Sequence, residues 1–199
     1  MLDRSHFGLQ ERDHIYLCAQ NPLKLHPDFD QIVGDILRHD PLGVVVLLRK
    51  KAHHVALVQR RMARTLPDVG NRIRWLAAPD QRAYFSLLTL ADVCLDTPHY
   101  SSMNTSYDTF AVGTPIVTWP GALMRGRYTA ALCQQMELKA CVADELAGVG
   151  LLARQFGSDS AYRREISRRI QHNSPILFEN RAVVAAFSQW FEEVYARGG

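Results

Sequence analysis

A lysine stands in the first polar loop of the chain, between two prolines that stiffen the backbone around it. The loop of residues 20–24 holds Lys24 together with the amide of Gln20, and Pro22 and Pro27 fix two of the nearby φ angles. A lysine ammonium is a compact positive charge that can neutralise a diphosphate as it leaves a substrate. These residue types predict a phosphate-binding role for Lys24, and a solvated surface lysine is the alternative.

A second polar loop, residues 95–108, contains residue types that begin a helix and attract an anion to its start. Asn104 and Thr105 are favourable helix-capping residues, and the free N–H groups at a helix start bind phosphate. Asp108 lies one turn further along, where its carboxylate can accept hydrogen bonds from the vicinal hydroxyls of a ribose. The alternative is an ordinary capped helix with a solvated aspartate.

Alternating apolar runs and helical spacings predict the elements that would position these loops. The expected strands are 15–18, 43–48, 72–76, 92–96, 115–118 and 139–143, and the expected helices are 29–37 (capped by Asp28), 51–65, 79–90, 104–112, 126–136, 144–156, 159–172 and 177–196. This order predicts an α/β fold with a Rossmann-like, doubly wound parallel sheet. Its strand-to-helix loops would share one ligand-binding edge.

Composition places the chain among ordinary globular proteins. It has 199 residues with 23 basic and 20 acidic side chains, and the resulting formal charge of +3 gives no reason to expect a nucleic-acid partner. The four cysteines lack metal-ligand spacing, which favours a reduced, cytoplasmic setting. The first residues carry no apolar core of a signal peptide, and no apolar run approaches the roughly 20 residues of a membrane span.

Three motifs in these loops are jointly specific. They are Gln-x-x-x-Lys-x-His-Pro-Asp-Phe from Gln20, Asp-Val-Cys-Leu-Asp-Thr-Pro from Asp92, and Asn-Thr-Ser-Tyr-Asp-x-x-Ala-x-Gly-Thr-Pro-Ile-Val-Thr-x-Pro-Gly from Asn104. From about residue 11 onward the chain resembles the O-linked N-acetylglucosamine transferases, in particular the bacterial, SPINDLY-like members. The resemblance covers only the carboxyl-terminal catalytic lobe of that family.

The resemblance implies the C-terminal lobe of a GT-B type glycosyltransferase that binds a UDP-sugar, with UDP-N-acetylglucosamine as the expected donor. It implies inverting transfer to protein Ser or Thr hydroxyls with no metal or other cofactor, and it gives Lys24 the catalytic role of stabilising the leaving diphosphate. Gln20 and Lys24 match the diphosphate contacts, and Asp108 matches the ribose contact. The full set of matched UDP-sugar residues is Gln20, Lys24, Ala78, Pro79, Tyr84, Met103, Asn104, Thr105 and Asp108.

The chain also departs from the family pattern. Met103-Asn104 stands where animal members have His-Thr, and Ser101 and Ser102 replace glycines of many bacterial members, which should limit how closely the backbone approaches a phosphate. Nothing corresponds to the first catalytic lobe or to tetratricopeptide repeats. A non-catalytic UDP-sugar binder that needs a partner is therefore the main alternative. An unrelated flavodoxin-like domain is a weaker one, because the paired acidic residues of a phospho-acceptor site are missing.

We expect three parts: an extension (1–10), the UDP-sugar-binding lobe (11–158), and C-terminal helices that pack on the lobe (159–199). The last helix carries an apolar stripe at three- and four-residue spacing, formed by Val183, Phe187, Trp190, Phe191 and Val194. Since the first lobe is missing, we expect part of the stripe to be uncovered and the chain to self-associate or to need a partner. His26 and His99 fall in the two loops, where each could contact a phosphate, transfer a proton or face solvent.

Overall fold

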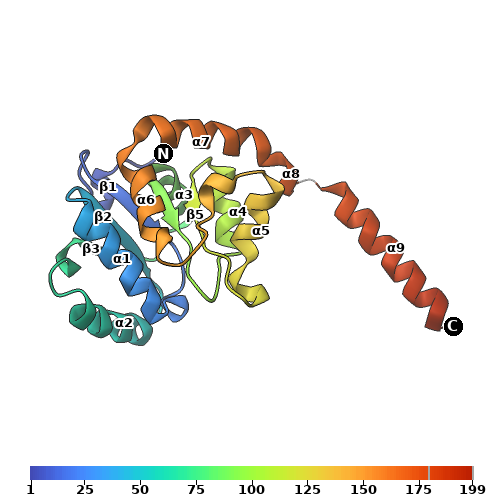
Figure 1. Ribbon diagram of the computed structural model, residues 1–199, viewed down its shortest axis with the longest axis horizontal. Coiled ribbons are helices and arrows are strands. Elements are labelled where there is room, and N and C mark those ends of the chain that lie inside the picture. The colour runs from blue at the N-terminus through green and yellow to red at the C-terminus, as the bar shows by residue number, and fades with distance from the viewer. Residues whose placement is uncertain (179, 199) are drawn as a thin grey trace.

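The computed structural model describes residues 1–178 and 180–198. Its centre is a five-stranded parallel sheet in the order β3-β2-β1-β4-β5 (Figure 1). The strands are β1 (His14–Cys18), β2 (Gly43–Arg49), β3 (Ile73–Ala77), β4 (Val93–Leu95) and β5 (Ile116–Val117). The chain winds outward from β1 to β3 and then returns to β4 on the other side of β1. This reversal makes the sheet doubly wound, as the alternating pattern predicts.

Helices cover both faces of the sheet. They are α1 (Pro27–His39), α2 (Ala52–Thr65), α3 (Gln81–Leu90), α4 (Asn104–Ala111), α5 (Tyr128–Gln135), α6 (Gly148–Ser158), α7 (Ser160–Asn173), α8 (Pro175–Phe178) and α9 (Arg181–Gly198). Right-handed crossovers place α1 and α2 on one face and α3 and α4 on the other. Helix α6 packs against α1 and contacts β1, β4 and β5. The central strands are apolar on both sides because helices bury both faces, and residues 15–18 and 44–48 are all buried.

The expected sixth strand at 139–143 does not form. Lys139–Cys141 is a 3-10 turn, and only Val142 forms an isolated parallel bridge, with Thr118. Two residues beyond Thr118, Pro120 lacks the N–H group that a ladder requires, so the edge beside β5 offers little backbone to pair with. The apolar run at 139–143 predicts a strand, but it does not show whether the neighbouring edge has backbone groups to pair with.

Two helix starts also differ from expectation. His26, and not Asp28, caps α1: its Nδ1 accepts a 3.3 Å hydrogen bond from the amide of Asp28. Asn104 and Thr105 are the first two residues inside α4, and Met103 occupies the N-cap position without a side-chain hydrogen bond. Side-chain type favours certain caps, but the path of the preceding loop decides which residue takes the position.

The two ends of the chain are held differently. In the N-terminal segment Leu9 is buried, and Arg4 lies 3.7 Å from the carboxylate of Asp92. Helix α7 packs on α6 and α4. Helix α9 extends away from the sheet (Figure 1), and none of its residues is buried. The expectation that the C-terminal helices all pack on the lobe therefore does not hold for α9, and the five residues of its apolar stripe are 45% to 61% exposed.

Candidate functional site

The loops after β1 and β4 meet at the point where the strand order reverses. β1 lies between β2 and β4 in the sheet, so the helices that follow β1 and β4 leave toward opposite faces. In open α/β sheets this divergence opens a crevice outside the carboxyl ends of the strands, where ligands bind. The two loops singled out in the sequence are those that follow these two strands.

Lys24 joins the two loops. Its Nζ donates a 3.0 Å hydrogen bond to Oε1 of Gln20, and a 3.2 Å hydrogen bond to the backbone carbonyl of Ser101 in the other loop. The ammonium also lies 4.6 Å from the ring centroid of Tyr100. The structure thus brings Gln20 and Lys24 together with the approach to α4, as their predicted shared role requires.

The charge of Lys24 is only partly compensated. Partial burial lowers the pKa of its ammonium, and the negative charge of Asp96 opposes that shift. Across residues 1–178 and 180–198, no carboxylate lies within 4.0 Å of the Lys24 ammonium. A half-buried cation held by neutral oxygens favours an anion beside it, since the anion would offset the cost of desolvation.

Two buried polar atoms near Lys24 have no hydrogen-bond partner. Gln20 is 5% exposed and Ser102 is 0% exposed, yet Nε2 of Gln20 and Oγ of Ser102 are unpaired. Such a group costs about 1–3 kcal/mol when left unsatisfied, so a protein seldom keeps two together without a use for them. The Gln20 amide, whose oxygen accepts from Lys24, can donate through Nε2 to an oxygen-rich ligand beside that lysine.

The start of α4 adds backbone donors to this edge. A helix leaves its first N–H groups without intrahelical partners, and the apolar Met103 side chain makes no capping hydrogen bond to them. The amides of Ser106 and Tyr107 bond back to the carbonyl of Met103. The earlier amides of the first turn, at Asn104 and Thr105, therefore remain the natural donors to a phosphate.

Asp96 organises the loop between β4 and α4, and the sequence reasoning missed its role. Its Oδ1 accepts from the amides of Thr97 (2.9 Å) and Ser102 (2.6 Å), and its Oδ2 accepts from the hydroxyls of Ser101 (2.6 Å) and Thr118 (2.7 Å). The carboxylate thereby folds the loop so that the carbonyl of Ser101 faces Lys24. An aspartate directly after a strand is the only local signal, because an Asp side chain readily bonds backbone amides further along a turn.

The two serines that replace family glycines are turned inward. Ser101 and Ser102 are both buried, and Oγ of Ser101, whose proton goes to Asp96, also lies 2.9 Å from Oγ1 of Thr129. Thr129 in turn shares a 2.7 Å hydrogen bond with the hydroxyl of Ser106. These side chains consequently lie in the interior beneath the loop, and the expected obstruction of a phosphate by the Ser101 side chain does not arise.

Tyr84 and Asp108 form a second pair at this edge. The Tyr84 hydroxyl, on α3, donates a 3.0 Å hydrogen bond to Oδ2 of Asp108 on α4, and burial raises the pKa of that phenol. Asp108 is therefore held in place and is not a freely solvated helix residue. Ala78 and Pro79 lie just beyond β3, with Ala78 exposed and Pro79 half-buried, in the turn that leads into α3.

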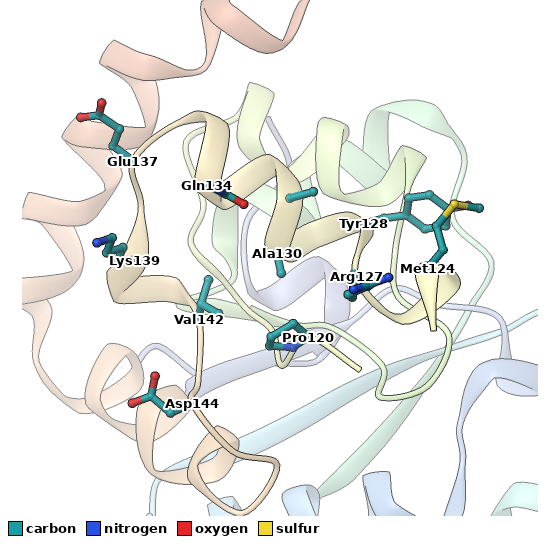
Figure 2. A pocket seen from close by; sticks show the side chains of 11 residues that line it. Pro120, Met124, Arg127, Tyr128, Ala130, Gln134, Glu137, Lys139, Val142 and Asp144 are labelled. Carbon is teal, nitrogen blue, oxygen red and sulfur yellow. The ribbon is translucent and has the colours of Figure 1, made fainter. Parts of the chain in front are cut away.

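A separate cleft of about 970 Å³ lies beside α5. Figure 2 shows side chains on its walls from α5 and from the segments before and after it, among them Arg127, Glu137, Lys139 and Asp144. None of the nine residues matched to UDP-sugar contacts lines this cleft. Its walls mix both signs of charge, whereas the Lys24 edge presents a cation and N–H donors, so the Lys24 edge suits a diphosphate better.

The fold is that of the C-terminal, Rossmann-like lobe of GT-B type glycosyltransferases. The chain belongs to glycosyl transferase family 41, whose family model matches residues 1–186. Both the fold class and the family indicated by the sequence motifs are confirmed.

Two solved structures share the architecture. A mutant O-GlcNAc transferase from Thermobaculum terrenum matches with a TM-score of 0.79 and 20% identity, over 94% of this chain and 36% of that one. HepE from Anabaena, in complex with UDP-glucose, matches with a TM-score of 0.69 and 12% identity, over 96% of this chain and 51% of that one.

A curated relative is also a glycosyltransferase by name. The probable UDP-N-acetylglucosamine–peptide N-acetylglucosaminyltransferase SEC of Arabidopsis thaliana is 29% identical over 145 residues, which are 65% of this chain and 13% of the relative. The chain thus spans about an eighth of this relative and a third to a half of the two solved structures. No helix within residues 1–178 and 180–198 is both long and apolar enough to cross a membrane.

Proposed function

We propose that this chain is the donor-binding lobe of a UDP-sugar-dependent transferase, and that UDP-N-acetylglucosamine is its donor. The observation that carries the proposal is the position of Lys24. Its half-buried ammonium links the loops after β1 and β4 at the reversal of the sheet, beside the start of α4. A ligand at this edge meets a cation and backbone N–H donors, which is the environment that a nucleoside diphosphate requires.

The proposed orientation follows the order of the side chains along the edge. The diphosphate lies by Lys24, Gln20 and the first amides of α4. The ribose hydroxyls bond to Asp108, one oxygen of which already accepts from Tyr84 while the other is available. The uracil lies toward Ala78 and Pro79, at the end of β3, because Tyr84 on α3 connects that turn to Asp108.

Transfer in this arrangement depends on stabilising the leaving group. A Ser or Thr hydroxyl of the acceptor protein attacks the anomeric carbon and releases its proton, the bond from that carbon to the diphosphate oxygen breaks, and the configuration inverts. Negative charge develops on the diphosphate, where Lys24 and the N–H groups of α4 are already oriented. We infer that this reaction needs no metal. We also infer a cytoplasmic setting, because the four cysteines are buried and free of disulfide bonds.

A binding function without transfer is the second candidate, and the uncovered face of α9 favours it. The chain would then be a subunit or fragment that holds the UDP-sugar while another lobe supplies the acceptor contacts. UDP binding without turnover, with turnover restored by an added lobe, would identify this case. The UDP-glucose bound to HepE makes glucose the first competitor for the identity of the sugar.

Titration calorimetry tests the proposal directly. We expect the purified chain to bind UDP, and UDP-N-acetylglucosamine at least as tightly as UDP-glucose. ADP is the matched control, because it carries the same diphosphate on a purine and should bind more weakly. Equal binding of UDP and ADP would contradict a uracil site, and no binding of UDP would contradict the donor-lobe function.

A further inference from the structure

Three potential metal ligands gather where the two loops meet, on residues that the proposed reaction does not use. His26 and Asp28 lie at the start of α1, and His99 lies in the loop after β4. Oδ2 of Asp28 lies 2.7 Å from Nε2 of His99 and 3.3 Å from Nδ1 of His26, and the two imidazole centroids are 4.5 Å apart. One ligand atom from each residue lies within 4.8 Å of the others.

This donor set suits a transition-metal cation. Two imidazoles and one carboxylate form the protein side of many zinc sites that keep a fourth position open. Zinc–ligand bonds of about 2.0–2.1 Å in a tetrahedron place neighbouring ligand atoms roughly 3.3 Å apart. The separation between Asp28 and His26, 3.3 Å, matches that value, and the separation between Asp28 and His99, 2.7 Å, is shorter. The ligand atoms of His26 and His99 lie within 4.8 Å of each other, and side chains that are 50% and 43% exposed have room to rotate toward a shared cation. Binding through Nδ1 of His26 would replace its hydrogen bond from the amide of Asp28.

The backbone does not explain why histidine occupies either position. His26 caps α1 through a long 3.3 Å hydrogen bond, although Ser, Asn or Asp makes a better cap. His99 has a φ of +69°, in the left-handed region that favours Gly and Asn. At both positions histidine suits the backbone less well than these alternatives, yet its imidazole lies beside the carboxylate of Asp28.

We propose that His26, Asp28 and His99 form a binding site for Zn²⁺ or a chemically similar divalent transition cation, with a fourth position open to water. A bound cation would displace the proton shared between His99 and Asp28, as metal binding to imidazole generally does. It would also tie the loop that carries Lys24 to the loop that carries Ser101. The site is separate from the diphosphate contacts, so it stands or falls independently of UDP binding.

Calorimetry with ZnCl₂ on the untagged full chain tests the site, using variants that preserve the backbone. His26→Ser keeps a good helix cap, and His99→Asn tolerates the left-handed conformation. Asp28→Asn keeps the shape of the side chain and removes its negative charge. We expect each to weaken Zn²⁺ binding at least about tenfold, the smallest loss that removal of even a supporting group causes. His39→Ser is the matched control, because His39 pairs with Asp35 at 3.0 Å, and the described part of the chain supplies no third ligand beside that pair. Zn²⁺ binding that is equal in the parent and the triad variants would overturn the proposal.

A second measurement needs no change in the triad. The ring of His99 lies 6.0 Å from that of Trp119, so paramagnetic Co²⁺ bound at the site should quench the fluorescence of Trp119. We expect the quenching to saturate at one equivalent, to be reversed by Zn²⁺, and to disappear in Trp119→Phe. Quenching that persists in Trp119→Phe would place the cation elsewhere and contradict the assignment.

Discussion

The edge between β1 and β4 and the terminal helix α9 differ in how many contacts their side chains make within this chain. At the edge, Asp96 accepts four hydrogen bonds and Lys24 links two loops, all within this chain. On α9, Phe187, Trp190 and Phe191 are 59%, 53% and 61% exposed. A surface of that kind favours association. The contrast supports the proposal that this lobe forms the donor site from its own residues, and it predicts a role for α9 in an assembly.

Loss of the Asp96 carboxylate should have the largest effect, because the whole edge depends on it. Asp96→Ala leaves two amides and two hydroxyls without their acceptor, so we expect the free energy of unfolding to fall by about 3–5 kcal/mol. Urea denaturation measures it. Asp144→Ala, at an exposed carboxylate beside the α5 cleft, should change stability by less than about 0.5 kcal/mol. Similar losses in both variants would mean that Asp96 has no organising role.

Loss of the Lys24 ammonium should reduce binding and leave folding nearly unchanged. Lys24→Ala removes a charge-assisted contact to the diphosphate, which should weaken UDP binding by about 1.5–3 kcal/mol. Calorimetry measures the affinity, and urea denaturation measures the stability. Lys139→Ala is the control, since Lys139 lies on the wall of the cleft beside α5. If Lys139→Ala were the variant that lost UDP, the cleft beside α5 would be the nucleotide site.

Local patterns predicted the layers of this molecule, but not the contacts between distant loops. Strand and helix alternation gave the doubly wound sheet, since buried parallel strands are apolar on both faces. The organising role of Asp96 depends on Ser101, Ser102 and Thr118, which only the folded chain brings to one point. No local pattern shows that arrangement.

The boundaries of the elements were less predictable for a related reason. A helical periodicity over 177–196 does not distinguish one helix from the α8 and α9 that the structure contains. Similarly, capping preference favoured Asn104, although the loop that Asp96 folds delivers Met103 to that position. The assignment of Gln20, Ala78, Pro79 and the other nucleotide contacts stays a prediction until binding is measured.

A smaller effect is expected at Asp108, and it concerns the sugar of the nucleotide. An aspartate that accepts from ribose hydroxyls should make the chain prefer UDP over its 2′-deoxy analogue. Asp108→Asn should lose about 1 kcal/mol of that preference, the usual value of one hydrogen bond. Tyr84→Phe keeps the carboxylate and removes only its internal donor, so it should retain the preference. Equal discrimination by the parent and Asp108→Asn would leave Asp108 with no role in ribose recognition.

The smallest effect on the stability of the lobe is expected from α9, although its effect on assembly should be large. Because no residue of α9 is buried, a chain that ends after Phe178 should unfold within about 0.5 kcal/mol of the parent. Its light scattering should report a monomer, whereas the full chain should self-associate or require a partner. Replacing Phe187, Trp190 and Phe191 by Ser in the full-length chain should also abolish the association.

A matched change on other exposed positions of α9 separates the apolar stripe from the helix itself. Ser188→Asn with Glu192→Gln alters polar residues only, so self-association should persist in that variant. We also expect the full chain to transfer no sugar to a peptide by itself, because the acceptor contacts belong to a lobe that these residues do not form. A radiolabelled transfer assay measures this. A monodisperse full-length monomer that glycosylates a peptide unaided would remove the contrast between the two regions, since α9 would then need no partner and the 199 residues would be a complete enzyme.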